Sequence, residues 1–333
     1  MRVATDGAEM GDLLFFDGGA SDVTNSTSNP SSGSRCYSIS ITGQGIKNIA
    51  SVSEFYLRTR IRPEAVPNST VRVIEWRNSS TVLGGVAITA TMLPAIHVGT
   101  TNVVTGDVSF VQNQYTLVEA HVLISDSSGS VQVTMDGILA AEYSGDTKPG
   151  TSSTVDNIRW TGNTLLSSQR IDDIAINDTT GVNDNSWCGD GHILMMTPDA
   201  DGDVIQLSRG GTDTGANWNQ VDEIPPDSDT TYVYSTGSGL YDLYNLTSGS
   251  VHVGALDTIS RVYIESRIRE TAAEGDIIRL GVKSSGSESW SSDIPVTTSY
   301  ARYERSDMIV NPITGVAWTI ADLDNLQVGF KVV

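Results

Sequence analysis

Apolar and polar residues alternate over short stretches of this chain, a pattern typical of β-strands with one buried face. Residues 55–62 place Phe55, Leu57 and Ile61 on one face and three arginines on the other, and Pro63 ends the stretch. The same pattern predicts strands at 37–41, 71–76, 82–90, 115–124, 131–135, 138–143, 155–160 and 171–176. Residues 13–16, 96–98 and 108–111 are shorter strand candidates.

Turn residues separate these stretches at regular spacing. Gly, Asn, Asp and Ser reach positive φ or bond to their own backbone, so clusters of them favour turns. Asp136-Gly137 is a two-residue hairpin signal between two predicted strands. No stretch shows helical periodicity over the length of a helix. About ten strands with frequent turns predict a jelly roll or β-sandwich for the first half of the chain.

The second half repeats this organisation after a polar joint. Residues 178–191 are rich in Gly, Asn, Asp and Ser, and an apolar stretch at 193–196 follows them. Further strands are predicted at 204–207, 231–234, 240–246, 250–253, 260–269, 277–283, 300–309 and 326–332. We therefore predict an all-β chain with two jelly-roll or β-sandwich domains in tandem: residues 1–180, a linker at 181–192, and a smaller domain at 193–333.

Charge and hydropathy restrict the partners. The chain holds 40 acidic residues against 20 basic ones, a formal net charge of −20. Such a surface repels phosphate backbones and anionic lipids, so we expect no nucleic acid partner. No apolar run approaches the roughly 18 residues of a membrane span, and residues 1–7 lack the apolar run of a signal peptide. We expect no membrane insertion and no export by an N-terminal signal.

Two groups of acids are candidate calcium ligands. Asp172 and Asp173 are adjacent, so on a regular strand they point to opposite faces and do not form a facing catalytic pair. A strand-edge residue with a turn acceptor is the plainer interpretation of the pair. Asp199, Asp201 and Asp203 have the 1-3-5 spacing of a calcium loop.

An EF-hand is rejected for this second group. The glycine at position 6 and the glutamate at position 12 are replaced by Val204 and Gly210. A looser Ca²⁺ site and a solvated β-turn remain the two alternatives. No cofactor is predicted beyond this.

Tryptophans and cysteines complete the candidate chemistry. Trp187, Trp218 and Trp290 lie in predicted loops, where they would contact a glycan or a protein partner, or else anchor the loops as partly buried residues. Cys36 and Cys188 do not make a disulfide framework, although a single bridge between them stays open. No serine lies in a nucleophile elbow, and no set of paired catalytic carboxylates is present.

Two resemblances follow from the longer strings. Residues 115–125, 129–140 and 171–178 together resemble a laminin-G or concanavalin A-like jelly roll: a strand, a hairpin, an Asp-Gly turn and a closing strand with two aspartates. The string from 171 to 191, with 221–227 and 230–233 after it, is similar to structural proteins of tailed bacteriophages. The resemblance implies a virion component with no enzymatic activity.

The functional expectation is a structural protein on the outer surface of a tailed phage virion, as a capsid decoration or tail-associated protein. Its partners would be other virion proteins of the capsid or tail lattice, and it would act as a homo-oligomer or in many copies. The alternative is a glycan-binding module of a tail fibre, in which the loop tryptophans contact a host surface glycan. A glycosidase ranks last, because no paired carboxylates are present.

Overall fold

The computed structural model describes residues 1–19, 22–212, 215–254 and 257–333. These residues form two compact units, Met1–Leu194 and Met195–Val333. Residues 181–192, which the sequence indicates as a linker, lie within the first unit. No helix in the described residues combines the length and the hydrophobicity that crossing a membrane requires.

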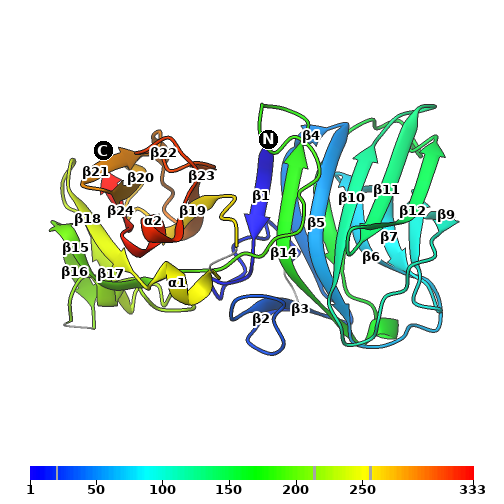
Figure 1. Ribbon diagram of the computed structural model, residues 1–333, viewed down its shortest axis with the longest axis horizontal. Coiled ribbons are helices and arrows are strands. Elements are labelled where there is room, and N and C mark those ends of the chain that lie inside the picture. Colours follow the sequence, from blue (N-terminus) through cyan, green and yellow to red (C-terminus); the bar gives the residue numbers. More distant parts are fainter. Residues whose placement is uncertain (20–21, 213–214, 255–256) are drawn as a thin grey trace. The chain divides into compact units, whose positions relative to one another are not determined.

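Unit 1 is a sandwich of two antiparallel sheets that face each other (Figure 1). Sheet A has the order β12 (Ile138–Gly145), β11 (Gly129–Met135), β10 (Thr116–Leu123), β5 (Glu54–Pro63), β14 (Ser168–Asp178), β3 (Cys36–Ser40) and β2 (Val23–Ser26), and β1 (Arg2–Asp6) also pairs with β14. Sheet B has the order β4 (Gln44–Val52), β13 (Val155–Thr161), β6 (Val71–Asn78), β7 (Thr81–Ile88), β8 (Pro94–Val98) and β9 (Thr101–Thr105).

The core of unit 1 lies between the two sheets. In β5 the apolar side chains of Phe55, Leu57 and Ile61 are buried in it, as the alternating pattern requires. Trp76 and Trp160 from sheet B are also fully buried there. Burial of apolar area at about 25 cal/mol per Å² is the main force that holds such sheets together. The polar alternate positions of sheet A are thereby directed away from sheet B.

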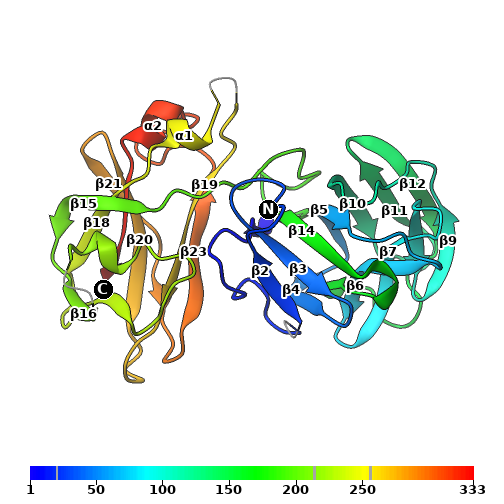
Figure 2. The same ribbon diagram turned by 90° about the horizontal axis from the view of Figure 1, so that it is seen from below.

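Unit 2 is built around sheet C, which has the order β15 (Pro198–Ile205), β18 (Tyr241–Leu246), β24 (Gln327–Val332), β20 (Ile277–Ser284) and β21 (Ser287–Trp290), with β22 (Ile294–Pro295) on β20. Two strand pairs accompany it, β16 (Ser208–Gly211) with β17 (Thr231–Tyr234), and β19 (Val262–Ile268) with β23 (Ala301–Met308). The core includes side chains from β19, β20 and β23. Short helices α1 (Gly249–His252) and α2 (Ile320–Asp324) lie side by side at one end (Figure 2).

The prediction of an all-β chain built from β-sandwich domains is confirmed. Four of the predicted strands are wrong. Residues 13–16 form a turn whose Phe15 and Phe16 rings join Tyr37 and Trp160 in the core. Residues 108–111 and 193–196 are irregular, and 250–253 overlap α1. Phe15, Phe16 and Phe110 are buried without a strand partner, whereas Val251 is 78% exposed, and periodicity alone does not distinguish such runs from strands.

Candidate functional site

The outer face of sheet A carries side chains in rows that cross from strand to strand. Residues paired directly across antiparallel strands project from the same face. One row consists of Asn177, Tyr56, His121, Gln132 and Glu142, on β14, β5, β10, β11 and β12. The residues on either side of Tyr56 lie in the core, so this row faces away from sheet B.

Residues 186–193, here called the covering segment, lie on part of this face. Asn177 Nδ2 donates a hydrogen bond to the carbonyl of Ser186 at 2.8 Å. The amide of Gly189 donates to Glu119 Oε1 at 2.7 Å, and Arg58 Nη1 donates to the Gly189 carbonyl at 3.2 Å. Arg58 and Glu119 are both buried. Burial raises the pKa of Glu119 and lowers the pKa of Arg58.

Asp173 fixes the end of the covering segment. Its side chain is completely buried. Oδ1 accepts hydrogen bonds from the amide of Ile193 at 2.8 Å and from Ser32 Oγ at 2.7 Å. Oδ2 lies 3.0 Å from His192 Nδ1 and 3.4 Å from Arg60 Nε. One carboxylate therefore holds both the covering segment and the loop at Ser32.

Asp172 binds the same loop, which corrects the expectation that the two acids face opposite sides. Asp172 Oδ2 accepts from the amides of Ser31 at 2.8 Å and Ser32 at 3.4 Å. The reason is a β-bulge: the pairing of β14 with β5 shifts between Asp172 and Ala175, and Asp173 has a φ of +52°. Both acids accept hydrogen bonds from a loop, as the turn-acceptor interpretation expects, but β14 has partner strands on both sides and is not an edge strand.

The buried pair Asp172 and Asp173 is expected to make the free energy of unfolding of unit 1 depend on pH. Burial, followed by the Asp173 carboxylate, raises the pKa of Asp172 to about 8. Between about pH 4 and pH 8 the folded chain holds a proton that the unfolded chain has released, so the free energy of unfolding falls as pH rises. The Asp172→Asn side chain is neutral at every pH in this range, so the free energy of unfolding of this variant is expected to fall less as pH rises. Urea unfolding at about pH 5 and about pH 9 measures it.

The matched control for this prediction is Asp190→Asn, because the Asp190 side chain is 70% exposed on the same face. It is expected to keep the wild-type pH dependence. Equal pH dependence in wild type and Asp172→Asn would contradict the proposed cause.

Where the covering segment begins, its Trp187 ring meets two other aromatic rings on the surface. The Tyr56 and His121 rings stack, with centroids 4.4 Å apart and an interplanar angle of 8°. The Trp187 ring contacts both edge-on, at 5.7 Å from Tyr56 and 6.0 Å from His121. Trp187 is 36% exposed. The predicted partner contact Trp187 is thus part of a cluster with two strand residues.

Polar groups surround this aromatic cluster. His121 Nε2 lies 2.8 Å from Glu54 Oε1, which orients the imidazole. Gln132 Nε2 donates to Glu142 Oε1 at 2.7 Å, and Glu142 is exposed. Carboxylate and amide groups both hydrogen-bond to hydroxyl groups. The arrangement is therefore suited to a hydroxylated ligand.

The acids Asp199, Asp201 and Asp203 lie on β15, on its exposed alternate positions, and not in a turn. Asp203 Oδ2 pairs with Lys283 Nζ at 2.6 Å, and Asp201 Oδ1 accepts from the Trp218 amide at 3.2 Å. Among the described residues, no three acidic, histidine or cysteine side chains are grouped as metal ligands. Calcium binding by these acids, or by Asp172 and Asp173, stays a prediction.

The remaining predicted site residues are Trp218 and Trp290 in unit 2 and the two cysteines in unit 1. Trp218 begins the short 3-10 helix η2 (Trp218–Gln220) and is partly buried. Trp290 ends strand β21 and was expected in a loop, so this placement is a correction. Cys36 and Cys188 are both free thiols. Burial raises the pKa of Cys188 to about 11, which keeps it protonated at neutral pH.

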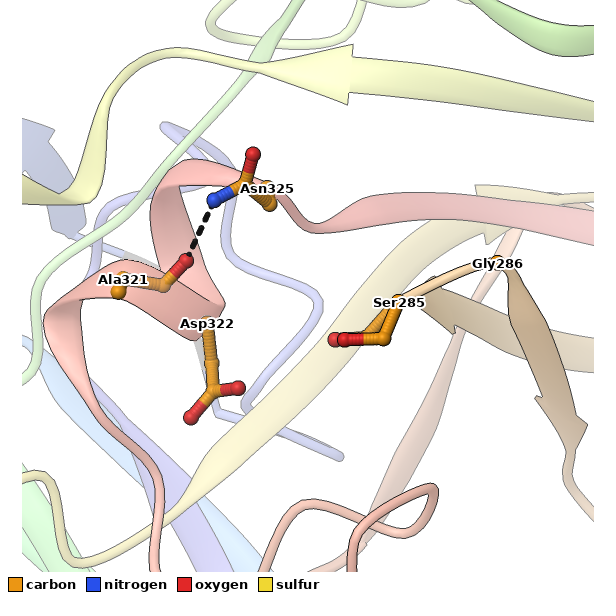
Figure 3. Close-up of a pocket in the computed structure, with 6 residues that line it drawn as sticks. Ser285, Gly286, Ala321, Asp322 and Asn325 are labelled. Carbon is orange, nitrogen blue, oxygen red and sulfur yellow. Dashed lines mark hydrogen bonds between the residues drawn. The ribbon is translucent and has the colours of Figure 1, made fainter.

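A polar pocket of about 520 Å³ opens between the β20–β21 turn and α2 in unit 2 (Figure 3). Its acidic group, Asp322, caps α2: it accepts hydrogen bonds from Thr319 N and Oγ1 and from Asn311 Nδ2. Asn325 Nδ2 donates to the carbonyl of Ala321. The carboxylate is thus occupied by the helix terminus, and the pocket has no other titratable group.

Four residues of the outer row were missed in the sequence, namely Tyr56, His121, Gln132 and Glu142. Each stands at a polar position of an alternating strand, which marks it as exposed but not as part of a site. Only the pairing of β5, β10, β11 and β12 brings these residues into one row.

No family model and no curated protein matches the chain. Among solved structures, an endo-β-1,4-glucuronan lyase from the fungus Trichoderma reesei matches with a TM-score of 0.41 and 12% identity, over 53% of this chain and 95% of the lyase. A sialidase matches with a TM-score of 0.37 and 12% identity, over 54% of this chain and 18% of its own. The Trypanosoma rangeli sialidase matches with a TM-score of 0.34 and 12% identity, over 46% and 26%. At such identities the likeness concerns the β-sandwich fold alone.

These matches correct the functional prediction. The named structures are a lyase and sialidases, whereas the sequence led us to expect a non-enzymatic structural protein of a phage virion. That expectation rested on the string from 171 to 191. The structure uses this string as a bulged strand and a covering segment, and such Gly-, Asn- and Asp-rich turns occur in many β-proteins. The virion location and the lattice partners depended on the same expectation.

Proposed function

We propose that the outer face of sheet A binds a saccharide chain beside the covering segment. The observation that supports this most is the cluster of Tyr56, His121 and Trp187, whose rings meet at the surface next to a row of hydrogen-bonding side chains. Ligand sites typically combine apolar or aromatic surface with a few well-placed polar groups. A pyranose ring offers both an apolar C–H face and a rim of hydroxyl groups.

The polar side chains of the row extend from the aromatic cluster in one direction across the sheet. His121, Gln132 and Glu142 are consecutive partners across β10, β11 and β12, so they extend away from Trp187 toward the edge of the sheet. Neighbouring strands are about 4.8 Å apart, so these three positions span roughly 10 Å. That length suits about two sugar residues of an extended chain. The hydroxyl rim would meet amide and carboxylate groups along it.

Replacement of Trp187 tests the proposal. Trp187→Ala is expected to weaken saccharide binding by about tenfold or more, because truncating an aromatic anchor at a binding surface typically removes more than 1 kcal/mol. Gln132→Ala, which leaves the covering segment intact, is expected to weaken it by a few-fold. Array screening with neutral and acidic oligosaccharides identifies a ligand, and calorimetry then measures affinity. Analysis of the same mixtures for new reducing ends reports any cleavage.

The control variant is Val182→Ala, since Val182 is 90% exposed and precedes the covering segment. It is expected to bind as the wild type does. A blank array, or a ligand bound equally by wild type, Trp187→Ala and Gln132→Ala, would refute saccharide binding at this face.

A further inference from the structure

A second surface, on the outer face of sheet C in unit 2, carries an aromatic corner with a free cation. Tyr241 pairs with Lys331, and Lys331 pairs with Arg279, so these three side chains form a row across β18, β24 and β20. The next row along the strands contains Gly329, Gly281 and Trp290. We propose that this surface binds a saccharide that bears a carboxylate group.

The glycines of the second row let the indole lie on the sheet. A Cβ atom at Gly281 would be 2.3 Å from Cε3 of Trp290, so the ring occupies the space above the Gly281 backbone. Gly329, the direct partner of Gly281, leaves the adjacent position equally flat. Trp290 is only partly buried, so the indole also offers surface to solvent. An aromatic face laid along a sheet in this way suits the apolar face of a sugar ring.

Glu288 fixes both aromatic rings. Tyr241 donates from its hydroxyl to Glu288 Oε1 at 3.1 Å, and Trp290 donates from Nε1 to Glu288 Oε2 at 3.1 Å. The two rings meet edge to face, with centroids 5.2 Å apart and an interplanar angle of 84°. A site whose rings are already held in place loses little conformational entropy when a ligand binds.

Lys331 supplies a positive charge that lies against the two rings. Its Nζ lies 5.4 Å from the Tyr241 ring centroid and 5.9 Å from that of Trp290. Arg279 is paired with Asp293 and Lys283 with Asp203, whereas Lys331 has no ion pair in the part of the chain that the structure describes. This is notable in a chain with twice as many acidic as basic residues. Lys331 also faces Arg279 directly across the strands, and Asp293 pairs with Arg279 and leaves Lys331 without a carboxylate of its own.

The combination identifies the ligand class. An indole face selects a ring with an apolar side, and an unpaired ammonium beside it selects an anion. A phosphate backbone is disfavoured by the net charge of −20, since a long polyanion meets the acidic surface beyond this corner. A uronic or sialic acid residue carries one carboxylate next to its ring, which matches one lysine next to one indole. This inference does not depend on the proposed site in unit 1.

The full chain is titrated with two probes, a hexuronic acid oligosaccharide and a sialylated oligosaccharide. Each probe is compared with its neutral counterpart, the carboxyl-reduced and the desialylated form. We expect at least one acidic probe to bind more tightly than its counterpart, by roughly five- to tenfold, as a charge-assisted contact requires. Lys331→Met, which keeps the aliphatic stem, is expected to abolish that preference, and Lys331→Arg to retain it.

Trp290→Ala is expected to weaken the acidic probe by about tenfold or more. Lys148→Met, at a partly exposed lysine of unit 1, is the charge-matched control and is expected to change nothing. Absence of binding for both acidic probes, equal affinity for acidic and neutral forms, or an unchanged preference in Lys331→Met would each overturn the inference. Loss of binding in Trp187→Ala alone, with Trp290→Ala unaffected, would uphold the unit 1 proposal and overturn this one.

Discussion

Replacing Asp173 by alanine is expected to lower the free energy of unfolding of unit 1 by about 3–5 kcal/mol. The carboxylate is fully buried and accepts hydrogen bonds from Ile193 N and Ser32 Oγ. It also contacts His192 and Arg60. Alanine leaves the buried Ile193 amide without its acceptor and removes one of the two carboxylates beside the Arg60 guanidinium, and the loss of a buried acceptor is costly in a water-poor environment. Urea unfolding followed by tryptophan fluorescence measures the change.

The same variant separates the two roles of the carboxylate. Hydrogen exchange in residues 31–34 and in the covering segment is expected to rise together, because one side chain holds both. Asp190→Ala is the control, since Asp190 makes a single exposed ion pair with Arg60 and is expected to have little effect. Loss of protection in only one of the two segments would show that Asp173 does not link them.

Replacing Asp242 by alanine is expected to destabilise unit 2 to a similar degree, about 3–5 kcal/mol. The Asp242 side chain is completely buried on β18. Its Oδ1 accepts from the amides of Gln206 at 2.6 Å and Leu207 at 2.8 Å. Its Oδ2 accepts from Asn217 Nδ2 at 2.7 Å and from the Tyr244 hydroxyl at 2.8 Å. Four donors from three segments lose their acceptor at once.

Thermal and urea unfolding of the full chain provide the measurement for Asp242→Ala. Asp203→Ala is the matched control, because that aspartate is exposed on β15 and makes one ion pair with Lys283. A stability of Asp242→Ala equal to that of the control would mean that Gln206, Leu207 and Asn217 find other acceptors, and the assigned role would be wrong. The sandwich of unit 1 is expected to keep its own unfolding transition in both variants.

The β-fold could be predicted because alternation is a local property. Strands such as β5, β10 and β11 are predicted by apolar residues at every second position. Asp136-Gly137 predicts the hairpin between β11 and β12. The errors fell on short apolar runs, as at residues 13–16, where tertiary packing buries Phe15 and Phe16, and at residues 250–253, where Val251 is exposed. No local pattern separates such runs from short strands.

The candidate sites could be predicted only in part. Trp187 and Trp290 were identified as contact residues from their type and polar neighbours. Their partners Tyr56, His121, Tyr241 and Lys331 were not, because cross-strand neighbours are set by the pairing of strands that are distant in sequence. The contacts of both Asp172 and Asp173 with the Ser32 loop could not be predicted for another reason. A bulge breaks the alternation from which we expected the two side chains to point to opposite faces.

That bulge also explains how the unevenly spaced isoleucines of β14 all face the core. Ile171, Ile174 and Ile176 are all fully buried, although the first two are three positions apart and the last two are two positions apart. In an unbroken strand that began with Ile171 facing inward, Asp173 and Asn177 would face the core, and both later isoleucines would face solvent. The extra residue restores the phase of the apolar pattern halfway along the strand. Loss of one aspartate would leave Ile171, Ile174 and Ile176 at alternate positions of a regular strand, so the apolar pattern would survive the deletion. The extra residue is therefore kept for its carboxylate contacts with the Ser32 loop and the covering segment and not for the core.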